Sequence, residues 1–165
     1  MCMDESSLKK LSTLIRYYIL TMTTRAGSGH PSSSLSSVEL MTTLFFKYLR
    51  YDMKDPKNAG NDRVIFSKGH ASPLYYALYA AAGVLSQKDL DGYRTFDSPL
   101  EGHPTSRFPY TEAATGSLGQ GLSIGLGEAM AIRLNNELRI KNYEKDQPTT
   151  IPNSKFLILF QKYSF

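Results

Sequence analysis

Apolar positions recur at three- and four-residue spacing in two stretches of the first fifty residues, 4–24 and 36–50. In the first stretch these positions are Leu8, Leu11, Leu14, Ile15, Tyr18, Ile19 and Met22. In the second they are Val38, Met41, Leu44, Phe45, Tyr48 and Leu49. This spacing places apolar side chains on one helix face, so both stretches are predicted to be amphipathic helices. Ser36 and Glu39 have the spacing of a capping box for the second helix.

The middle of the chain combines a strand signal with a further helix signal. Residues 63–66, RVIF, are a short apolar run that is prone to form a β-strand. Ser72 and Pro73 are predicted to be the N-cap and the first residue of the next helix. Gly83 is predicted to close that helix, because glycine readily adopts the left-handed conformation found after a helix end.

The next segments change from helix to loop and back to helix. Ser86 and Asp89 predict a capped short helix. Residues 96–117 contain several prolines and glycines and show no period, so they are predicted to be a long loop, a kind of segment that is usually functional or disordered. Residues 116–140 begin rich in glycine and become helical at the apolar positions Leu122, Leu126, Ala129 and Met130.

A second apolar run, KFLILF at 155–160, is predicted to be a buried strand. Helices that alternate with short apolar strands indicate the α/β class with a parallel sheet. The chain shows no repeat and no internal boundary, so residues 1–165 are predicted to belong to one domain. With only two predicted strands, the helices surround a partial parallel sheet, and their apolar faces are expected to remain partly uncovered.

Composition excludes several classes of protein. The chain is 41% hydrophobic and 21% charged, as in ordinary globular proteins, and no apolar run is long enough to span a bilayer. Its net charge of +4 is mild and its basic residues are scattered, which argues against nucleic-acid binding. The start lacks the apolar core of a signal peptide, and the single cysteine, Cys2, forms no internal disulfide. A cytoplasmic location is therefore expected.

The three histidines of the chain, His30, His70 and His103, all follow a glycine. Glycine allows close approach of another group or a positive φ, so each histidine is presented beside a tight backbone. Zinc accepts three histidines and a water molecule, but the spacing of short zinc motifs is absent. An unrelated zinc hydrolase and three histidines satisfied by the local backbone are the two alternatives to a shared site.

Glycines gather at the start of the last predicted helix, at Gly116, Gly119, Gly121, Gly125 and Gly127. Each glycine inside a helix costs about 1 kcal/mol relative to alanine, so their number needs a reason. One reason is an anion held by free N–H groups at the helix start. The other is close helix packing, since Gly121 and Gly125 share one face.

Four motifs then occur in a fixed order: AGSGHP at 26–31, DRVIFSKGHASPLYYAL at 62–78, LEGHP at 100–104 and ATGSLGQGLS at 114–123. Together they resemble the N-terminal, thiamine diphosphate-binding part of transketolases, over about residues 8–135. The resemblance implies transfer of a two-carbon ketol unit between sugar phosphates, as in the pentose phosphate pathway. The motifs are shared with relatives such as dihydroxyacetone synthases.

The resemblance also implies roles for individual residues. His30 matches a catalytic histidine that contacts the substrate and assists proton transfer, and His103 matches a catalytic histidine beside the cofactor and the reacting carbons. His70 matches a residue that holds the diphosphate of the cofactor. The remaining cofactor-binding positions implied are Ser33, Gly116, Ser117 and Leu118.

One part of the family pattern is missing. In transketolases the strand that matches KFLILF leads into a Gly-Asp-Gly turn, and the Asp and a later Asn bind magnesium. Here QKYSF, residues 161–165, stands in that place, and Lys and Gln side chains do not form a hard-cation site. The chain therefore supplies no metal ligands, and its tail from 155 to 165 is atypical.

The missing part divides the functional expectation in two. One hypothesis is the N-terminal segment of a longer or multi-chain magnesium-dependent transferase that is inactive alone. Its expected partners are sugar phosphates and a second copy of the chain or a C-terminal transketolase part. The other is a catalytically inactive fragment that interacts with an intact transketolase subunit. No nucleic acid and no membrane is expected as a partner.

Overall fold

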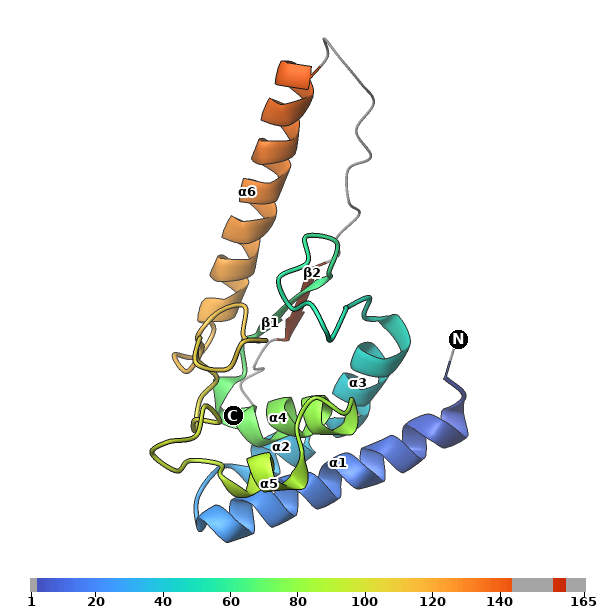
Figure 1. The fold of residues 1–165 in the computed structure, drawn as a ribbon, viewed down its shortest axis with the longest axis vertical. Helices are drawn as coiled ribbons and strands as arrows, with labels where there is room; N and C mark the ends of the chain where they lie inside the picture. Colours follow the sequence, from blue (N-terminus) through green and yellow to red (C-terminus); the bar gives the residue numbers. More distant parts are fainter. Residues whose placement is uncertain (1–2, 144–155, 160–165) are drawn as a thin grey trace.

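The computed structural model describes residues 3–143 and 156–159, and side chains of the last helix up to residue 135 (Figure 1). The described chain is rich in helix. The helices are α1 (Glu5–Ala26), α2 (Pro31–Leu35), α3 (Val38–Thr43), α4 (Ser72–Ala81), α5 (Gln87–Asp91) and α6 (Gln120–Tyr143). Helices α1 to α5 form one body, and α6 extends away from it (Figure 1).

Two short strands lie beside the base of α6. Strand β1 (Arg63–Phe66) pairs in parallel with β2 (Phe156–Leu159), and the register joins Ile65 to Ile158. Parallel strands need a crossover connection, and here it contains α4, α5 and α6. The strands predicted at 63–66 and 155–160 are thus found at 63–66 and 156–159 within the described residues.

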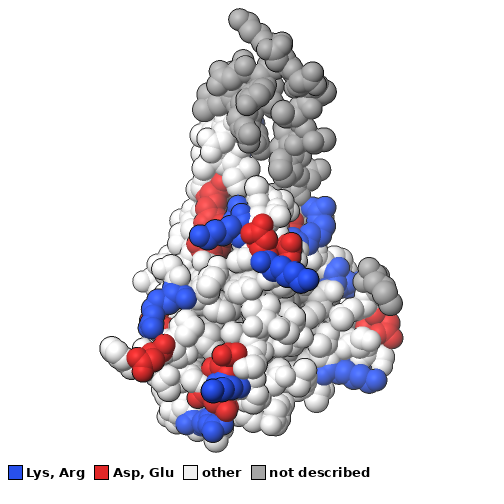
Figure 2. All heavy atoms as spheres, viewed as in Figure 1, with Lys and Arg blue, Asp and Glu red and all other residues white. Residues whose placement is uncertain are grey.

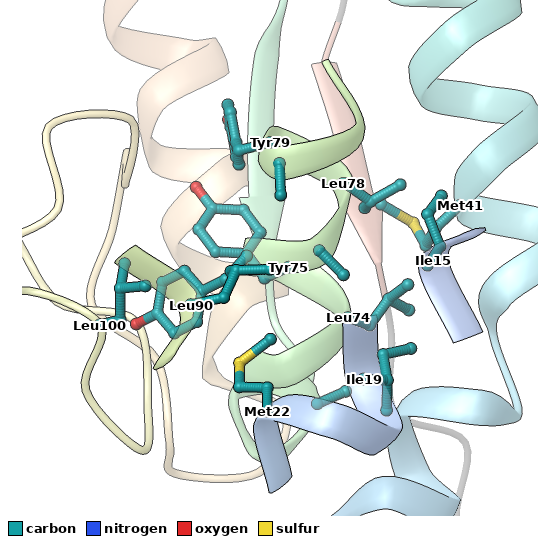
Figure 3. Close-up of a cluster of buried hydrophobic side chains, with 14 of the residues drawn as sticks. Ile15, Ile19, Met22, Met41, Leu74, Tyr75, Leu78, Tyr79, Leu90 and Leu100 are labelled. Carbon is teal, nitrogen blue, oxygen red and sulfur yellow. The ribbon is translucent and has the colours of Figure 1, made fainter. Parts of the chain in front are cut away.

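The core is built around α4, whose apolar residues lie on all sides rather than on one stripe (Figure 3). Residues Ser72 to Ala80 are all buried. Leu74 and Leu78 face Ile15 and Ile19 of α1, so these two positions of the predicted apolar stripe are buried against α4. Leu14, another predicted position of the stripe, is exposed. A helix that is apolar all round is stable only when other elements cover every face, and α1, α3, β1 and the loop after α5 do so here.

Tyrosine hydroxyls tie the core to the predicted long loop. Tyr75 Oη donates to the Tyr110 carbonyl at 2.8 Å, and Tyr76 Oη donates to the Glu101 carbonyl at 3.0 Å. Both rings are buried, and their hydroxyls would be costly to bury without partners. The loop is therefore held in place although it contains no helix or strand between residues 92 and 119.

The first predicted helix is confirmed and both of its ends have a local cause. The Asp4 side chain accepts from Ser7 N at 3.0 Å, and Gly27 ends the helix with a φ of +57°. The capped short helix is also confirmed. Ser86 Oγ accepts from Asp89 N, and the Asp89 carboxylate accepts from Ser86 N at 2.7 Å.

The helix predicted over about 36–50 is found over residues 38–48, where α3 continues directly into a π-helical turn, Leu44–Tyr48. The predicted capping box does not form because its members bond elsewhere. Ser36 Oγ donates to the Ser33 carbonyl at 2.9 Å, and the Glu39 carboxylate pairs with Arg16 of α1.

The predicted N-cap role of Ser72 is also wrong. A 3₁₀ turn, Gly69–Ala71, leads directly into α4, so Ala71 is the N-cap and Ser72 is the first helical residue. Its hydroxyl is used for tertiary contacts described below. Gly83 has a φ of +81° just after the helix end, as predicted.

Helix α6 differs from the others in exposure. Leu122, Leu126, Met130 and Leu134 are all exposed, and Leu126 keeps 57% of its surface accessible. The expected uncovered apolar face is therefore found on this helix. Within the described residues, no helix is long and apolar enough to cross a membrane.

Charged residues of both signs are interspersed on the face shown in Figure 2. Ion pairs among the described residues include Arg63 with Glu112 at 2.9 Å and Arg25 with Asp91 at 2.6 Å. No extended basic stripe is visible on this face.

Candidate functional site

The three histidines come together from three distant parts of the sequence. His30 precedes α2, His70 lies in the 3₁₀ turn between β1 and α4, and His103 lies in the loop that follows α5. The ring centroids of His30 and His70 are 5.1 Å apart, and those of His70 and His103 are 4.6 Å apart. Both contacts are edge-on. Because His70 takes part in both, it is the centre of these three residues, which we call the histidine cluster.

Two of the glycines that precede these histidines are explained by close approach. Gly29 has a φ of +123°, and a Cβ there would lie 3.0 Å from Thr23 Cγ2. A Cβ at Gly69 would lie 2.7 Å from the carbonyl carbon and oxygen of Thr115. The turn of His70 thus rests on the backbone that leads to Gly116. The repeated Gly-His pair has a packing cause at these turns.

Gly102, before His103, is enclosed from two sides. A Cβ there would lie 3.1 Å from Cζ of Arg94. The Gly102 carbonyl accepts a 2.7 Å hydrogen bond from Ser72 Oγ, whose own oxygen is 2.9 Å from the Tyr93 hydroxyl. Because the Ser72 proton is used on Gly102, the Tyr93 hydroxyl donates to Ser72.

Two imidazole nitrogens in the cluster have no hydrogen-bond partner. His70 Nδ1 and His103 Nε2 are both buried and unpaired among the described residues. Buried polar atoms normally have partners, since an unmade hydrogen bond costs about 1–3 kcal/mol. These two atoms therefore mark a place where a polar ligand fits.

The electrostatics of the cluster favour a neutral His103. Burial lowers the pKa of His103, and the neighbouring His70, His30 and Arg94 lower it further in that order. Burial also lowers the pKa of Lys68, whose Nζ donates to Ser36 Oγ at 3.0 Å. A neutral imidazole can both accept and donate a hydrogen bond, which a charged one cannot.

The structure brings most of the predicted site residues to one place. The ring of His103 lies 3.3 Å from where a Cβ of Gly116 would be, so Gly116 is at the cluster. Ser33 lies in α2, which contacts the turn of His70. The exposed Ser117 and Leu118 follow Gly116 directly, and no described contact joins their side chains to the cluster.

The glycines at the start of α6 are explained best by packing. Gly121 is buried, and a Cβ there would lie 2.4 Å from Ser67 Cβ; its N–H donates to Ser67 Oγ at 3.2 Å. Gly119 has a φ of +88°, which an L side chain rarely adopts. Of the two interpretations, close packing is supported at Gly121, whereas Gly127 stands in open space.

Two residues beside the cluster were missed by the sequence reasoning. Lys68 stands two positions before His70 in the same motif, so its place there was a usable signal. Arg94 lies outside every motif, and only the folded backbone brings it to Gly102. Arg94 and Gly102 also line a cavity of about 590 Å³. Its other lining residues are Thr95, Phe96, Asp97, Glu101 and Arg107.

The cluster fits an organic cofactor better than a metal ion. The unpaired His70 and His103 nitrogens and the close Gly116 backbone suit a large polar ligand such as thiamine diphosphate. In the part of the chain that the structure describes, no group of three His, Cys, Asp or Glu residues is placed to hold a metal ion. The zinc alternative is therefore unsupported among the described residues. The atypical tail, 160–165, lies outside the described residues.

Comparisons with known proteins agree with this arrangement. Residues 7–160 match the family described as the transketolase, thiamine diphosphate binding domain. The chain is 46% identical to human transketolase over 123 residues, which are 74% of this chain and 20% of that protein. It is 35% identical over 133 residues to one of the subunits of apulose-4-phosphate transketolase from Phocaeicola vulgatus, covering 81% of this chain and 47% of that protein.

A solved structure shows the same backbone. Transketolase from Leishmania mexicana superposes with a TM-score of 0.73 at 31% identity, covering 80% of this chain and 20% of that one. The chain thus spans about a fifth of the length of the first curated relatives it matches.

Proposed function

The chain belongs to the transketolase family, within its thiamine diphosphate-binding domain, and from this we propose that it forms part of an enzyme that transfers two-carbon ketol units between sugar phosphates. The observation that carries the proposal is the histidine cluster. Three Gly-His turns from separate elements converge, and two of their nitrogens lack a polar partner. The same proposal assigns the chain to the carbohydrate metabolism of pentose phosphates.

We assign the cofactor to the space beside the cluster. His70 holds its diphosphate end, and Ser33, His103, Gly116, Ser117 and Leu118 form the surrounding wall. When bound, thiamine diphosphate supplies the nucleophilic carbon and accepts the electron pair of the two-carbon unit. The proximity of Gly116 to the His103 ring supports a shared role for these two positions.

We assign proton transfer and substrate orientation to His30 and His103. His30 is exposed and next to the cluster, so it can reach a sugar from the solvent side. His103 is partly buried and its pKa is lowered by burial first, so its neutral ring accepts a proton or a hydroxyl hydrogen bond near neutral pH. Both roles require only hydrogen-bond reach to the substrate.

The proposal includes partners beyond this chain. Residues 1–165 are proposed to be the N-terminal part of an α/β domain whose remaining sheet, magnesium ligands and second active-site face come from further transketolase sequence or a second copy. The Phocaeicola vulgatus relative is itself named as a subunit, so a divided enzyme has a precedent among the relatives. The cytoplasmic location expected from the cysteine content stays a prediction.

A second candidate function is an inactive fragment that binds an intact transketolase subunit. One observation favours it: the apolar face of α6 is uncovered. Both candidates predict that the chain alone transfers no ketol unit. They differ in what happens when the remaining sequence is supplied.

The test is complementation. The chain is co-expressed with the part of human transketolase that follows the matched residues, and ketol transfer is assayed with thiamine diphosphate and magnesium. We expect transfer by the complex and none by the chain alone. A stable complex without transfer would contradict the enzyme-part proposal and favour the second candidate.

In the active complex, His103→Ala is expected to lower kcat by about 10²–10⁴-fold, the usual contribution of a positioned acid or base. The melting temperature should change little, because the ring is only partly buried. Ser106→Ala, an exposed change in the same loop, is the matched control and should leave kcat unchanged. An unchanged kcat in His103→Ala would remove His103 from the site.

A further inference from the structure

Arg94 has a backbone conformation that arginine rarely adopts. Its φ is +62°, and within the described residues it is the only residue other than glycine with a positive φ. The conformation is held by a 2.8 Å hydrogen bond from Arg94 N to the Leu100 carbonyl. A left-handed conformation brings Cβ close to the carbonyl oxygen, so glycine or asparagine would be more stable here. An arginine that persists in such a place points to a use for its side chain.

The guanidinium of Arg94 lies directly on the turn of His103. A Cβ at Gly102 would be 3.1 Å from both Cζ and Nη1 of Arg94, and 3.4 Å from its Nε. Three guanidinium atoms at similar distance mean that the plane lies flat against Gly102. Within the described residues no ion pair or hydrogen bond holds this guanidinium, whereas Arg107 in the same cavity is paired with Glu101 at 2.9 Å.

The residue before Arg94 secures two of the Gly-His turns. Tyr93 is buried, and its ring lies 3.4 Å from where a Cβ of Gly29 would be. Its hydroxyl reaches Ser72, which in turn donates to the Gly102 carbonyl. Arg94 therefore contacts Gly102 directly, and Tyr93 is linked to it through Ser72.

The ionisable groups that act on His103 are all basic, and Arg94 is the one that is permanently charged. They come from His70 in the 3₁₀ turn, from His30 before α2 and from Arg94 after α5, and each lowers its pKa in addition to burial. The carboxylate of Glu101, two positions before His103, accepts hydrogen bonds from Arg107 and, at 2.6 Å, from the Thr105 hydroxyl. Asp97 lines the same cavity as Arg94, and within the described residues no carboxylate is among the causes of the His103 pKa shift, which are burial, His70, His30 and Arg94.

We infer that Arg94 is a positioning residue for His103: its guanidinium fixes the Gly102 turn that presents the imidazole, and its charge favours the neutral ring. The consequence for turnover rests on the proposed function, because it requires that His103 act on the substrate. The structural role does not rest on it, since the contacts involve this chain alone. A nearby fixed charge of the same sign disfavours protonation of an imidazole.

The test is the titration of His103 in the full chain by NMR, with the ring nitrogens labelled and the three histidines assigned through single His→Gln variants. Arg94→Gly removes the guanidinium and also relieves the positive φ. We expect a melting temperature no lower than that of the wild type and a His103 titration midpoint at higher pH. A residue that matters only for folding would not give a stable protein with an altered His103.

Arg94→Lys and Arg107→Gln complete the design. Arg94→Lys keeps the charge without the flat plane, so its midpoint should lie between those of the wild type and Arg94→Gly. Arg107→Gln removes a charge from the same cavity that Glu101 already balances, and should leave the midpoint in place. If Arg94→Gly does not fold, a midpoint raised in Arg94→Gln and raised less in Arg94→Lys supports the inference. An unchanged midpoint in Arg94→Gly or Arg94→Gln, or an equal shift in Arg107→Gln, would overturn it, whether or not the chain binds thiamine diphosphate.

Discussion

Helices α4 and α6 are both rich in apolar residues, yet one is enclosed and the other is bare. Leu74 of α4 is 0% exposed, whereas Leu126 of α6 is 57% exposed. Helix α4 has α1, α3 and β1 around it, and α6 contacts little more than the two strands at its base. The difference shows that an apolar helix pattern predicts burial only where other elements of the chain are placed to cover the helix.

The comparison is sharpest for leucines of equal size in the two helices. Leu74→Ala is expected to lower the free energy of unfolding by about 2–5 kcal/mol, because it leaves a cavity in a filled core. Leu126→Ala should change it by less than about 0.5 kcal/mol, since its side chain has few contacts to lose. Urea unfolding of the two variants measures both values. Equal losses would mean that α6 is covered in solution.

A second pair tests where α6 is anchored. Gly121→Ala is expected to lower the free energy of unfolding by about 1–3 kcal/mol, because its Cβ would meet Ser67 at 2.4 Å. A Cβ at Gly127 would lie in open space, so Gly127→Ala should raise the free energy of unfolding by up to about 1 kcal/mol. Thermal unfolding followed by circular dichroism compares them. A stabilising Gly121→Ala would show that α6 does not rest on Ser67.

The smallest expected effect is the pH dependence at the histidine cluster. Burial, then His70, His30 and Arg94, lower the pKa of His103 in the folded chain below its ordinary value of 6.5. The unfolded chain therefore takes up the proton first as the pH falls, and stability decreases below about pH 6.5 until the folded-state pKa is passed. His103→Gln should reduce this decrease between pH 7 and 5 in urea unfolding. An unaltered pH profile would assign the decrease to other groups.

Local signals account for the parts of the fold that the sequence predicted well. The Asp4 cap, the Gly27 and Gly83 ends and the Ser86–Asp89 box each involve residues within a few positions of one another. The capping box predicted for the helix over 36–50 failed because Ser36 and Glu39 bond to residues outside the box, one of them in α1. Periodicity carries no information about such competing partners.

The candidate site was predictable only in part for a related reason. The Gly-His pairs identify the three histidines along the chain, and their convergence was implied by the family resemblance rather than by spacing. Arg94 could not be predicted from the sequence. Its contact with Gly102, eight residues later, depends on its own left-handed backbone conformation. Such a contact arises from a loop path, which has no period to detect.

The tyrosine contacts of the core make the protein its own optical reporter. The chain has 11 tyrosines and no tryptophan, so its near-ultraviolet absorbance and emission come chiefly from tyrosine. Burial raises the pKa of Tyr51 to about 12 and that of Tyr75 and Tyr76 well above the ordinary value. The hydroxyls of Tyr75 and Tyr76 bond to the loop that carries His103, so the tyrosinate absorbance that develops last in alkaline solution, after that of exposed tyrosines such as Tyr17 and Tyr48, reports when this loop separates from α4.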